Sequence, residues 1–150
     1  MQIYTDGSCH TQLRIGAWAA IILWETEVIE LVGHQYDTTH NAMEILAVLK
    51  AIDFILEKNF PYTTIEIISD SQYVVRILER KQKLVNANFL TKKNKPIRNV
   101  ALVKKLIKHI DTLPLIFTKI KAHQKKTSQI NYNRVADQLA RTEVRKWVYN

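Results

Sequence analysis

The feature that most constrains the fold is a change of hydrophobic period near residue 40. Before it, three short segments at residues 1–6, 17–24 and 27–33 are rich in Ile, Val, Tyr and Trp and are separated by few residues. This pattern is typical of an antiparallel β-meander. After it, apolar residues recur at helical spacing through residues 42–57, which predicts an amphipathic helix.

The remaining segments continue the alternation of strands and helices. Residues 64–69 predict a strand that leads into a short helix at about residues 71–79, and residues 99–110 predict a further helix. A strand at residues 115–120 and an amphipathic helix at about residues 134–147 complete the chain. Because strands joined by helical crossovers pair in parallel, we expect an α/β fold with a five-stranded mixed sheet, antiparallel in its first three strands and parallel later.

One domain is expected for residues 1–150. No internal repeat, low-complexity tract or Gly/Ser/Pro-rich linker interrupts the chain, and 47% hydrophobic residues suffice for a core at this length. The one cysteine, Cys9, excludes an intramolecular disulfide. The start lacks the pattern of a signal peptide, and the longest apolar run, Ala17–Trp24, is far shorter than the roughly 20 residues of a membrane-spanning helix. We therefore expect a cytoplasmic protein with no membrane partner.

Charge is distributed very unevenly along the chain, whose net charge is +8. Residues 1–75 carry a net charge of −7, residues 76–126 of +13 and residues 127–150 of +2. The densest basic stretch runs from Arg80 to Arg98 and contains no acidic residue. Such a cluster predicts a polyanionic partner.

Apolar and aromatic residues are interleaved with this basic stretch, namely Leu84, Val85 and Phe89. They can pack against sugars or bases while lysines neutralise phosphates, which favours nucleic acid as the partner. A solvated basic face that binds nothing in particular is the alternative.

Some carboxylates stand where an ionised group needs a partner. Glu44 shares its helical face with small and apolar residues such as Ala47 and Val48, so its charge needs a partner such as a cation. A favourable position at the helix N-terminus is an equal alternative. Asp6 and Asp70 each follow an apolar strand, and ligands of open α/β sheets bind at the carboxyl ends of strands. For Asp70, an N-cap of the following helix is the alternative.

Asp137 adds a fourth carboxylate near the start of the last helix. Arg134 and Arg141 flank it, so a helical ion pair is the alternative for this residue. Four carboxylates at one strand edge repel each other unless divalent cations neutralise them. Hard oxygen ligands, with a single cysteine and scattered histidines, favour Mg²⁺ or Mn²⁺ over zinc.

Five short motifs follow one another along the chain, namely Tyr4–Cys9, Thr38–Glu44, Ser69–Val74, Lys121–His123 and Asn133–Arg141. Taken together and in this order, they resemble those of the type 1 ribonuclease H family, which cleaves the RNA strand of RNA/DNA hybrids. The resemblance covers almost the whole chain, in a free-standing, bacterial-like form with a basic protrusion. The family's sheet order would be third, second, first, fourth and fifth strand.

The resemblance implies an acidic active site and two bound Mg²⁺ ions, which Mn²⁺ can replace. One ion would activate the attacking water and the other would stabilise the leaving 3′-oxygen, giving 5′-phosphate and 3′-hydroxyl ends. His123 would assist proton transfer or product and metal release without ligating metal. The metal ligands implied are Asp6, Glu44, Asp70 and Asp137.

The resemblance also implies where the hybrid would bind. The basic protrusion, at about residues 80–98, would grip the DNA strand. Thr39 and Asn99 match positions that bind a DNA phosphate, and Asn41 and Gln72 match residues that contact the hybrid in its minor groove. The lysines implied in binding are Lys92, Lys93 and Lys95. A monomer without an obligate protein partner is expected.

Some positions depart from the family's pattern. The segment 10–16 replaces the usual Gly-rich loop after the first aspartate, and Asp37 stands where many members place an arginine. Arg80 and Leu84 stand where the protrusion usually has tryptophans. Because the four acids are retained, these departures bear on hybrid affinity more than on the chemistry.

Three alternatives compete with a free-standing ribonuclease H. The same fold occurs as a domain of reverse transcriptases, although a chain that starts at Met1 just before the first strand favours a free-standing enzyme. A nucleic-acid-binding module that has lost catalysis is disfavoured, because clustered carboxylates oppose a polyanion. A transposase or junction resolvase would space its acids differently and carry extra domains.

Overall fold

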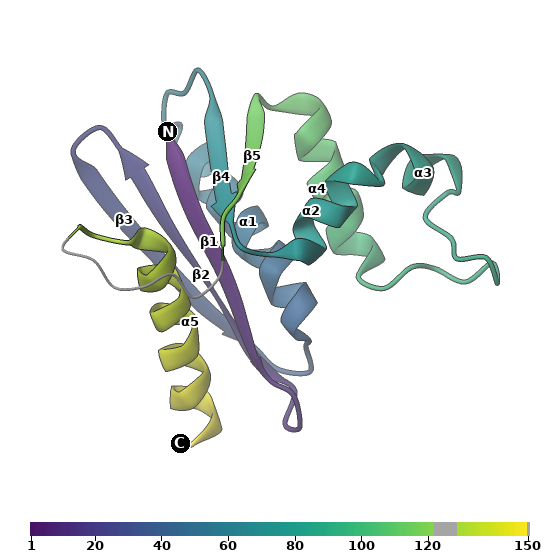
Figure 1. Cartoon of the computed structure of the whole chain (residues 1–150), viewed down its shortest axis with the longest axis horizontal. Helices are drawn as coiled ribbons and strands as arrows, with labels where there is room; N and C mark the ends of the chain where they lie inside the picture. The colour runs from purple at the N-terminus through teal and green to yellow at the C-terminus, as the bar shows by residue number, and fades with distance from the viewer. Residues whose placement is uncertain (122–128, 150) are drawn as a thin grey trace.

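The computed structural model describes residues 1–121 and 129–149, which are organised around one five-stranded sheet (Figure 1). The strand order is β3-β2-β1-β4-β5. Strands β1 (Gln2–His10), β2 (Ile15–Trp24) and β3 (Glu27–Gln35) form an antiparallel meander. Strands β4 (Ile65–Ser69) and β5 (Leu115–Lys119) continue the sheet in parallel with β1. The expected mixed α/β sheet and its strand order are therefore confirmed.

Helices cover both faces of the sheet. Helix α1 (His40–Glu57) packs on β1 and β2 and also contacts α4 (Val100–Thr112), whereas α5 (Tyr132–Val148) packs on the opposite face over β1, β2 and β3. Helices α2 (Gln72–Glu79) and α3 (Lys81–Asn86) project sideways from the sheet beyond β4 and β5 (Figure 1). The projection contains the basic stretch found in the sequence.

The larger core lies between the sheet and helices α1 and α4. Branched apolar side chains of alternate strand positions, such as Ile3 and Ile67, meet the apolar stripe of α1, and all of these residues are fully buried. Alternate positions of a strand point to one face, so the next residues of β1 point toward α5. A smaller core, which includes Ala19, Ile21 and Ala136, lies under α5.

Two local features differ from the sequence prediction. Strand β1 extends to His10, because β2 continues to pair with it beyond the point where pairing with β4 ends at Thr5 and Ser69. Asp6 therefore lies within β1, and the expectation that it ends a strand is wrong. The six-residue helix α3 was not predicted by periodicity, since Leu84 is its one buried residue and gives no apolar stripe.

Within residues 1–121 and 129–149, we find no helix that combines the length and the apolar character needed to span a membrane.

The core predicts a contrast between two isoleucines on neighbouring parallel strands. Ile67 of β4 is fully buried, whereas Ile116 of β5 is 53% exposed. Substitution Ile67→Ala should lower the free energy of unfolding by about 2–5 kcal/mol, because it leaves a cavity. Ile116→Ala removes the same atoms from the surface and should cost about 1 kcal/mol or less. Urea unfolding of both variants measures the difference, and equal losses would contradict this placement of the core.

Candidate metal centre

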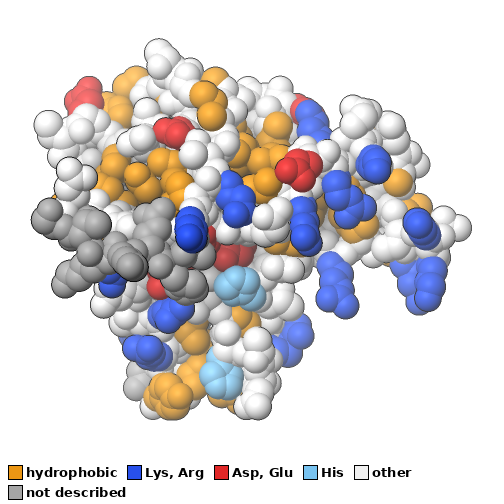
Figure 2. Space-filling view, viewed as in Figure 1, with side chains coloured by type: hydrophobic (Ala, Val, Ile, Leu, Met, Phe, Trp, Pro, Cys, Tyr) orange, Lys and Arg blue, Asp and Glu red, His pale blue; other side chains and the backbone are white. Residues whose placement is uncertain are grey.

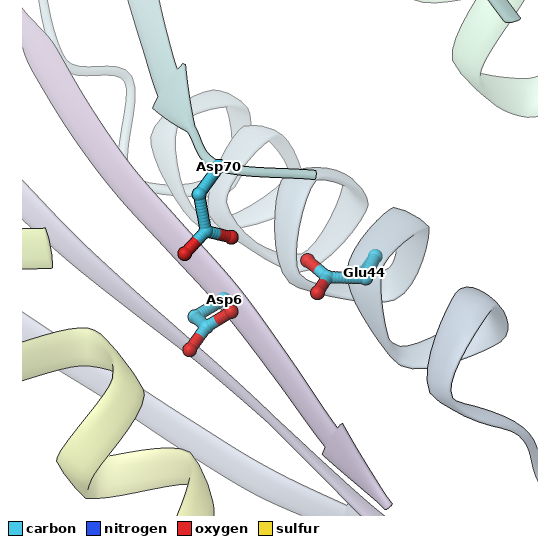
Figure 3. Close-up of side chains that lie close together, drawn as sticks. All are labelled: Asp6, Glu44 and Asp70. Carbon is cyan, nitrogen blue, oxygen red and sulfur yellow. The ribbon is translucent and has the colours of Figure 1, made fainter. Parts of the chain in front are cut away.

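Three carboxylates converge at the edge of the sheet. Asp6 comes from β1, Glu44 from the second turn of α1 and Asp70 from the residue that follows β4. One carboxylate oxygen from each lies within 4.8 Å of the other two. Figure 3 shows the three side chains turned toward one another from these three elements. We call these residues the acidic trio.

Strand register brings the two aspartates together. Thr5 of β1 pairs with Ser69 of β4 at the last position of their parallel ladder. Asp6 and Asp70 directly follow these two paired residues, so they stand side by side where the pairing of β1 with β4 ends. The convergence thus follows from the predicted parallel pairing, in the register that the structure gives.

Gly7 allows α1 to approach this edge closely. A Cβ atom at Gly7 would lie 2.6 Å from the backbone nitrogen of Glu44 and 2.7 Å from the backbone carbon of Met43. Any side chain here would therefore push the first turns of α1 away from β1. The absent side chain is what lets Glu44 reach the aspartates.

Glu44 is a buried acid with an incomplete set of partners. It is 3% exposed, and its Oε1 lies 3.0 Å from His40 Nε2. Its Oε2 has no hydrogen-bond partner among the described residues. Burial raises the pKa of Glu44 and outweighs the opposing effect of His40. A buried carboxylate with an unpaired oxygen is suited to binding a cation.

Asp6 has the most strongly perturbed acidity. Burial, and to a smaller extent the neighbouring carboxylates of Glu44, Asp70 and Asp137, together raise the pKa of Asp6 to about 9. Like charges in a site of low dielectric cannot all ionise without a counter-charge. A divalent cation would supply that counter-charge.

Asp70 does not cap the following helix. The N-cap of α2 is Ser71, whose Oγ accepts a hydrogen bond from the backbone N–H of Val74 at 3.2 Å. The structure therefore contradicts the N-cap alternative for Asp70 and leaves its carboxylate available to the acidic trio.

Asp137 lies beside the trio without being part of it. It lines the same pocket, and a hydrogen bond with Asp6 contributes to the raised pKa of that residue. Its Oδ1 also accepts a hydrogen bond from Arg141 Nε at 3.1 Å. Asp137 is thus a neighbour of the other acids and also a member of a helical ion pair with Arg141. The two expectations for this residue are compatible with each other.

The chemistry of these donors fits a hard divalent cation. The described ligand atoms are carboxylate oxygens, one of them buried and unpaired, and Mg²⁺ and Mn²⁺ prefer such oxygens. The pocket around them has a volume of about 570 Å³, which leaves room for a ligand larger than a single ion. The polar residues that also line it include His40, Asn41, Gln72 and Arg141.

Some of the residues predicted to bind the hybrid lie around the pocket of the acidic trio or at the starts of α1 and α4, and the others lie on the projection. Asn41 and Gln72 are exposed and line the pocket of the acidic trio. Thr39 is also exposed, and its Oγ1 caps α1 by accepting a hydrogen bond from the N–H of Ala42 at 3.1 Å. Asn99 adopts a left-handed conformation at the start of α4, and its Nδ2 donates to the hydroxyl of Tyr73 at 3.2 Å.

The predicted lysines lie away from the acidic trio, on the projection. Lys92, Lys93 and Lys95 are exposed in the connection between α3 and α4. His123 lies outside the described residues, so its predicted place is not described. Asp37, one of the departures from the family's pattern, pairs with Arg14 at 2.8 Å, and both residues have a positive φ.

Sequence reasoning did not assign roles to two residues that shape the site. The first is Gly7, whose close contact with α1 could have been suspected only from its place beside Asp6. The second is His40, which stands four residues before Glu44, a spacing that puts both side chains on one helical face. Because this spacing can be read from the sequence, it could have indicated that His40 contacts Glu44.

Comparison with known proteins identifies the family of this chain. A model of the RNase H family matches residues 1–145. A ribonuclease H of Chlorobium limicola is 31% identical over 145 residues, covering 95% of this chain and 94% of that protein. A ribonuclease H of Chlorobium phaeovibrioides is 34% identical over 146 residues (96% and 94% covered). A ribonuclease HI of Rickettsia conorii is 32% identical over 143 residues (95% and 91% covered).

A solved structure shares the fold. The structure of the foamy viral protease-reverse transcriptase in complex with dsDNA superposes with a TM-score of 0.69 and 21% sequence identity, covering 97% of this chain and 94% of that chain. The sheet order and the fold neighbour define an α/β protein with a ribonuclease H-like fold. The chain belongs to the RNase H family, which confirms the resemblance drawn from its motifs.

Gly7 offers a test of how the trio is assembled. Gly7→Ala should displace the first turns of α1, because its Cβ would meet backbone atoms of that helix. We expect a loss of stability together with weaker Mn²⁺ binding, measured by thermal unfolding and isothermal titration calorimetry. Gly33→Ala is the matched control, since its Cβ would crowd the ring of Trp18 instead. Unchanged Mn²⁺ affinity in Gly7→Ala would contradict the role of this contact.

The raised pKa of Asp6 predicts how stability depends on pH without metal. In the unfolded chain Asp6 loses its proton near its ordinary pKa of 3.8, whereas in the folded protein it holds the proton up to about pH 9. The folded state thus binds more protons in this window, so its stability falls as pH rises from about 4 to 9.

Thermal unfolding in EDTA at several pH values measures this effect. The melting temperature of the wild-type protein should fall toward pH 9, and Asp6→Asn should flatten the decline because it removes the titrating group. Saturating Mg²⁺ should restore most of the loss at high pH. Parallel pH profiles for the two proteins in EDTA would show that Asp6 is not the source of the effect.

Proposed function

We propose that this chain is a metal-dependent endoribonuclease that hydrolyses the RNA strand of RNA/DNA hybrids. The observation that carries the proposal is the acidic trio of Asp6, Glu44 and Asp70, the first two of them buried, in a chain of the RNase H family. Buried carboxylates cost free energy unless a partner compensates them, and a bound cation would be that partner. The expected products carry 5′-phosphate and 3′-hydroxyl ends.

The acidic trio and Asp137 would hold two Mg²⁺ ions, with Mn²⁺ able to replace them. When bound, the ions supply an activated water and stabilisation of the leaving 3′-oxygen. Asp6 and Glu44 would form the buried side of this site, since both are nearly inaccessible to solvent. Asp137 would close the site from α5, held in orientation by Arg141. His123 is proposed to move a proton beside the site.

The basic projection would provide affinity for the hybrid. Figure 2 shows Lys and Arg side chains spread over the side from which α2 and α3 project. A second cleft, of about 270 Å³, lies there and is lined by Arg76, Arg80 and Arg98 together with apolar residues. Guanidinium groups beside apolar side chains suit a sugar-phosphate backbone. Arg80, which stands where the family's protrusion usually has a tryptophan, thus contributes positive charge to this cleft.

The remaining predicted contacts would place the scissile strand over the acids. Asn41 and Gln72 face the pocket of the trio, so they are positioned to contact the minor groove, where RNA displays its 2′-hydroxyls. Thr39 and Asn99 would hold a phosphate of the DNA strand, and Lys92, Lys93 and Lys95 would reach the same strand farther along. We further propose that residues 1–150 act as one domain, monomeric and without an obligate protein partner, in the cytoplasm.

A binding module without catalysis is the alternative, and the acids argue against it. Burial of Asp6 and Glu44 costs free energy, and the negative charge of the trio opposes a polyanion. If the chain is instead the ribonuclease H domain of a reverse transcriptase, it would be part of a larger protein, but the same reaction is expected.

Cleavage of an end-labelled RNA/DNA hybrid tests the proposal. With Mg²⁺ the RNA strand should be cut, whereas EDTA should prevent cutting. Single-stranded RNA, double-stranded RNA and double-stranded DNA should remain intact. Binding of the hybrid without cleavage in both Mg²⁺ and Mn²⁺ would favour the binding module.

Asp70→Asn sharpens this test. It removes a metal ligand and a negative charge that repels the hybrid, so cleavage should fall by roughly 10³-fold or more while hybrid binding stays the same or tightens. Asp53→Asn on the exposed face of α1 is the matched control and should retain activity. A fully active Asp70→Asn protein would refute the assigned role of the trio.

A further inference from the structure

We propose that His40 is a positioning residue that orients the carboxylate of Glu44 for metal binding. The inference rests on the proposed function, since it assigns a residue to the metal site of that reaction. His40 belongs to the motif Thr38–Glu44, but the sequence alone indicated no role for it.

Helix geometry places the two residues together. His40 is the first residue of α1, and Glu44 follows four positions later, so their side chains share one helical face. Nε2 of His40 lies 3.0 Å from Oε1 of Glu44. The other oxygen, Oε2, is buried and has no hydrogen-bond partner among the described residues. One oxygen is therefore fixed while the other remains available.

The position of His40 suits this role. Its side chain is 56% exposed, in contrast to the enclosed side chain of Glu44, and it lines the same pocket as the acidic trio. Glu44 itself is only 3% exposed. His40 thus contacts its carboxylate from the side of the pocket.

The bond does not require a charged imidazole. A neutral ring with its proton on Nε2 donates to Oε1, and a protonated ring donates in the same way. His40 therefore orients Glu44 in either form. Partners of this kind, which fix a metal-ligating carboxylate, typically change metal affinity or activity by about 10–100-fold when removed.

A different role for His40 makes a different prediction. Thr39 and Asn41, its neighbours in sequence, are proposed to contact the hybrid, and His40 is exposed enough to do the same. A residue that only contacts substrate would change KM and leave the affinity for metal unaltered. A residue that orients Glu44 changes metal affinity even when no substrate is present.

Three variants separate these roles. His40→Ala removes the donor, His40→Gln keeps an N–H donor that can reach Glu44 from the same position, and His109→Ala on α4 is a control outside the pocket. Circular dichroism checks folding, titration calorimetry with Mn²⁺ measures metal affinity without substrate, and hybrid cleavage gives kcat and KM.

We expect His40→Ala to weaken Mn²⁺ binding by about 10-fold or more and to lower kcat at subsaturating metal. His40→Gln should recover most of both, and His109→Ala should resemble the wild-type protein. Wild-type Mn²⁺ affinity in folded His40→Ala, or a change confined to KM, would overturn the inference, as would failure of His40→Gln to exceed His40→Ala. If the wild-type protein binds Mn²⁺ more tightly than His40→Ala but does not cleave the hybrid, the proposed function fails and the positioning role stands.

Discussion

The close approach of α1 to β1 is the contact on which the rest of the site depends. Gly7 permits it, because a side chain at this position would collide with the backbone of α1. The same approach seals Glu44 from water and places it within reach of Asp6 and Asp70. Packing and chemistry are thus linked at one residue: the contact that completes the core also forces acidic groups together.

Electrostatic repulsion is the cost of this arrangement. Asp6 is buried beside other carboxylates, so its pKa lies far above the ordinary value, and one oxygen of Glu44 has no partner among the described residues. The protein places positive charge elsewhere, on the projection formed by α2, α3 and the connection to α4. Separation of the two charges is consistent with the proposed function, which needs one surface that attracts a polyanion and one site that holds cations.

Much of the fold could be predicted from the sequence because its signals are local. The long amphipathic stripe of α1 and the apolar strands on either side of it specify element type through hydrophobic period. Prediction from the sequence was less accurate where contact with another part of the chain determines whether an element forms and where it ends. Strand β1 runs on past Asp6 because β2 pairs with it to His10. Helix α3 carries one buried side chain, Leu84, and shows no period of its own.

The sequence by itself determined which acids the protein has, the order of its motifs and the basic character of residues 76–126. It also determined the spacing of His40 and Glu44, since contacts within one helix follow from residue number. Only the tertiary structure decided that Asp6, Glu44 and Asp70 meet, because they are distant in sequence and are joined by parallel pairing and by the packing of α1. The raised pKa values of Asp6 and Glu44 have the same origin, since burial and the proximity of like charges exist only in the folded chain.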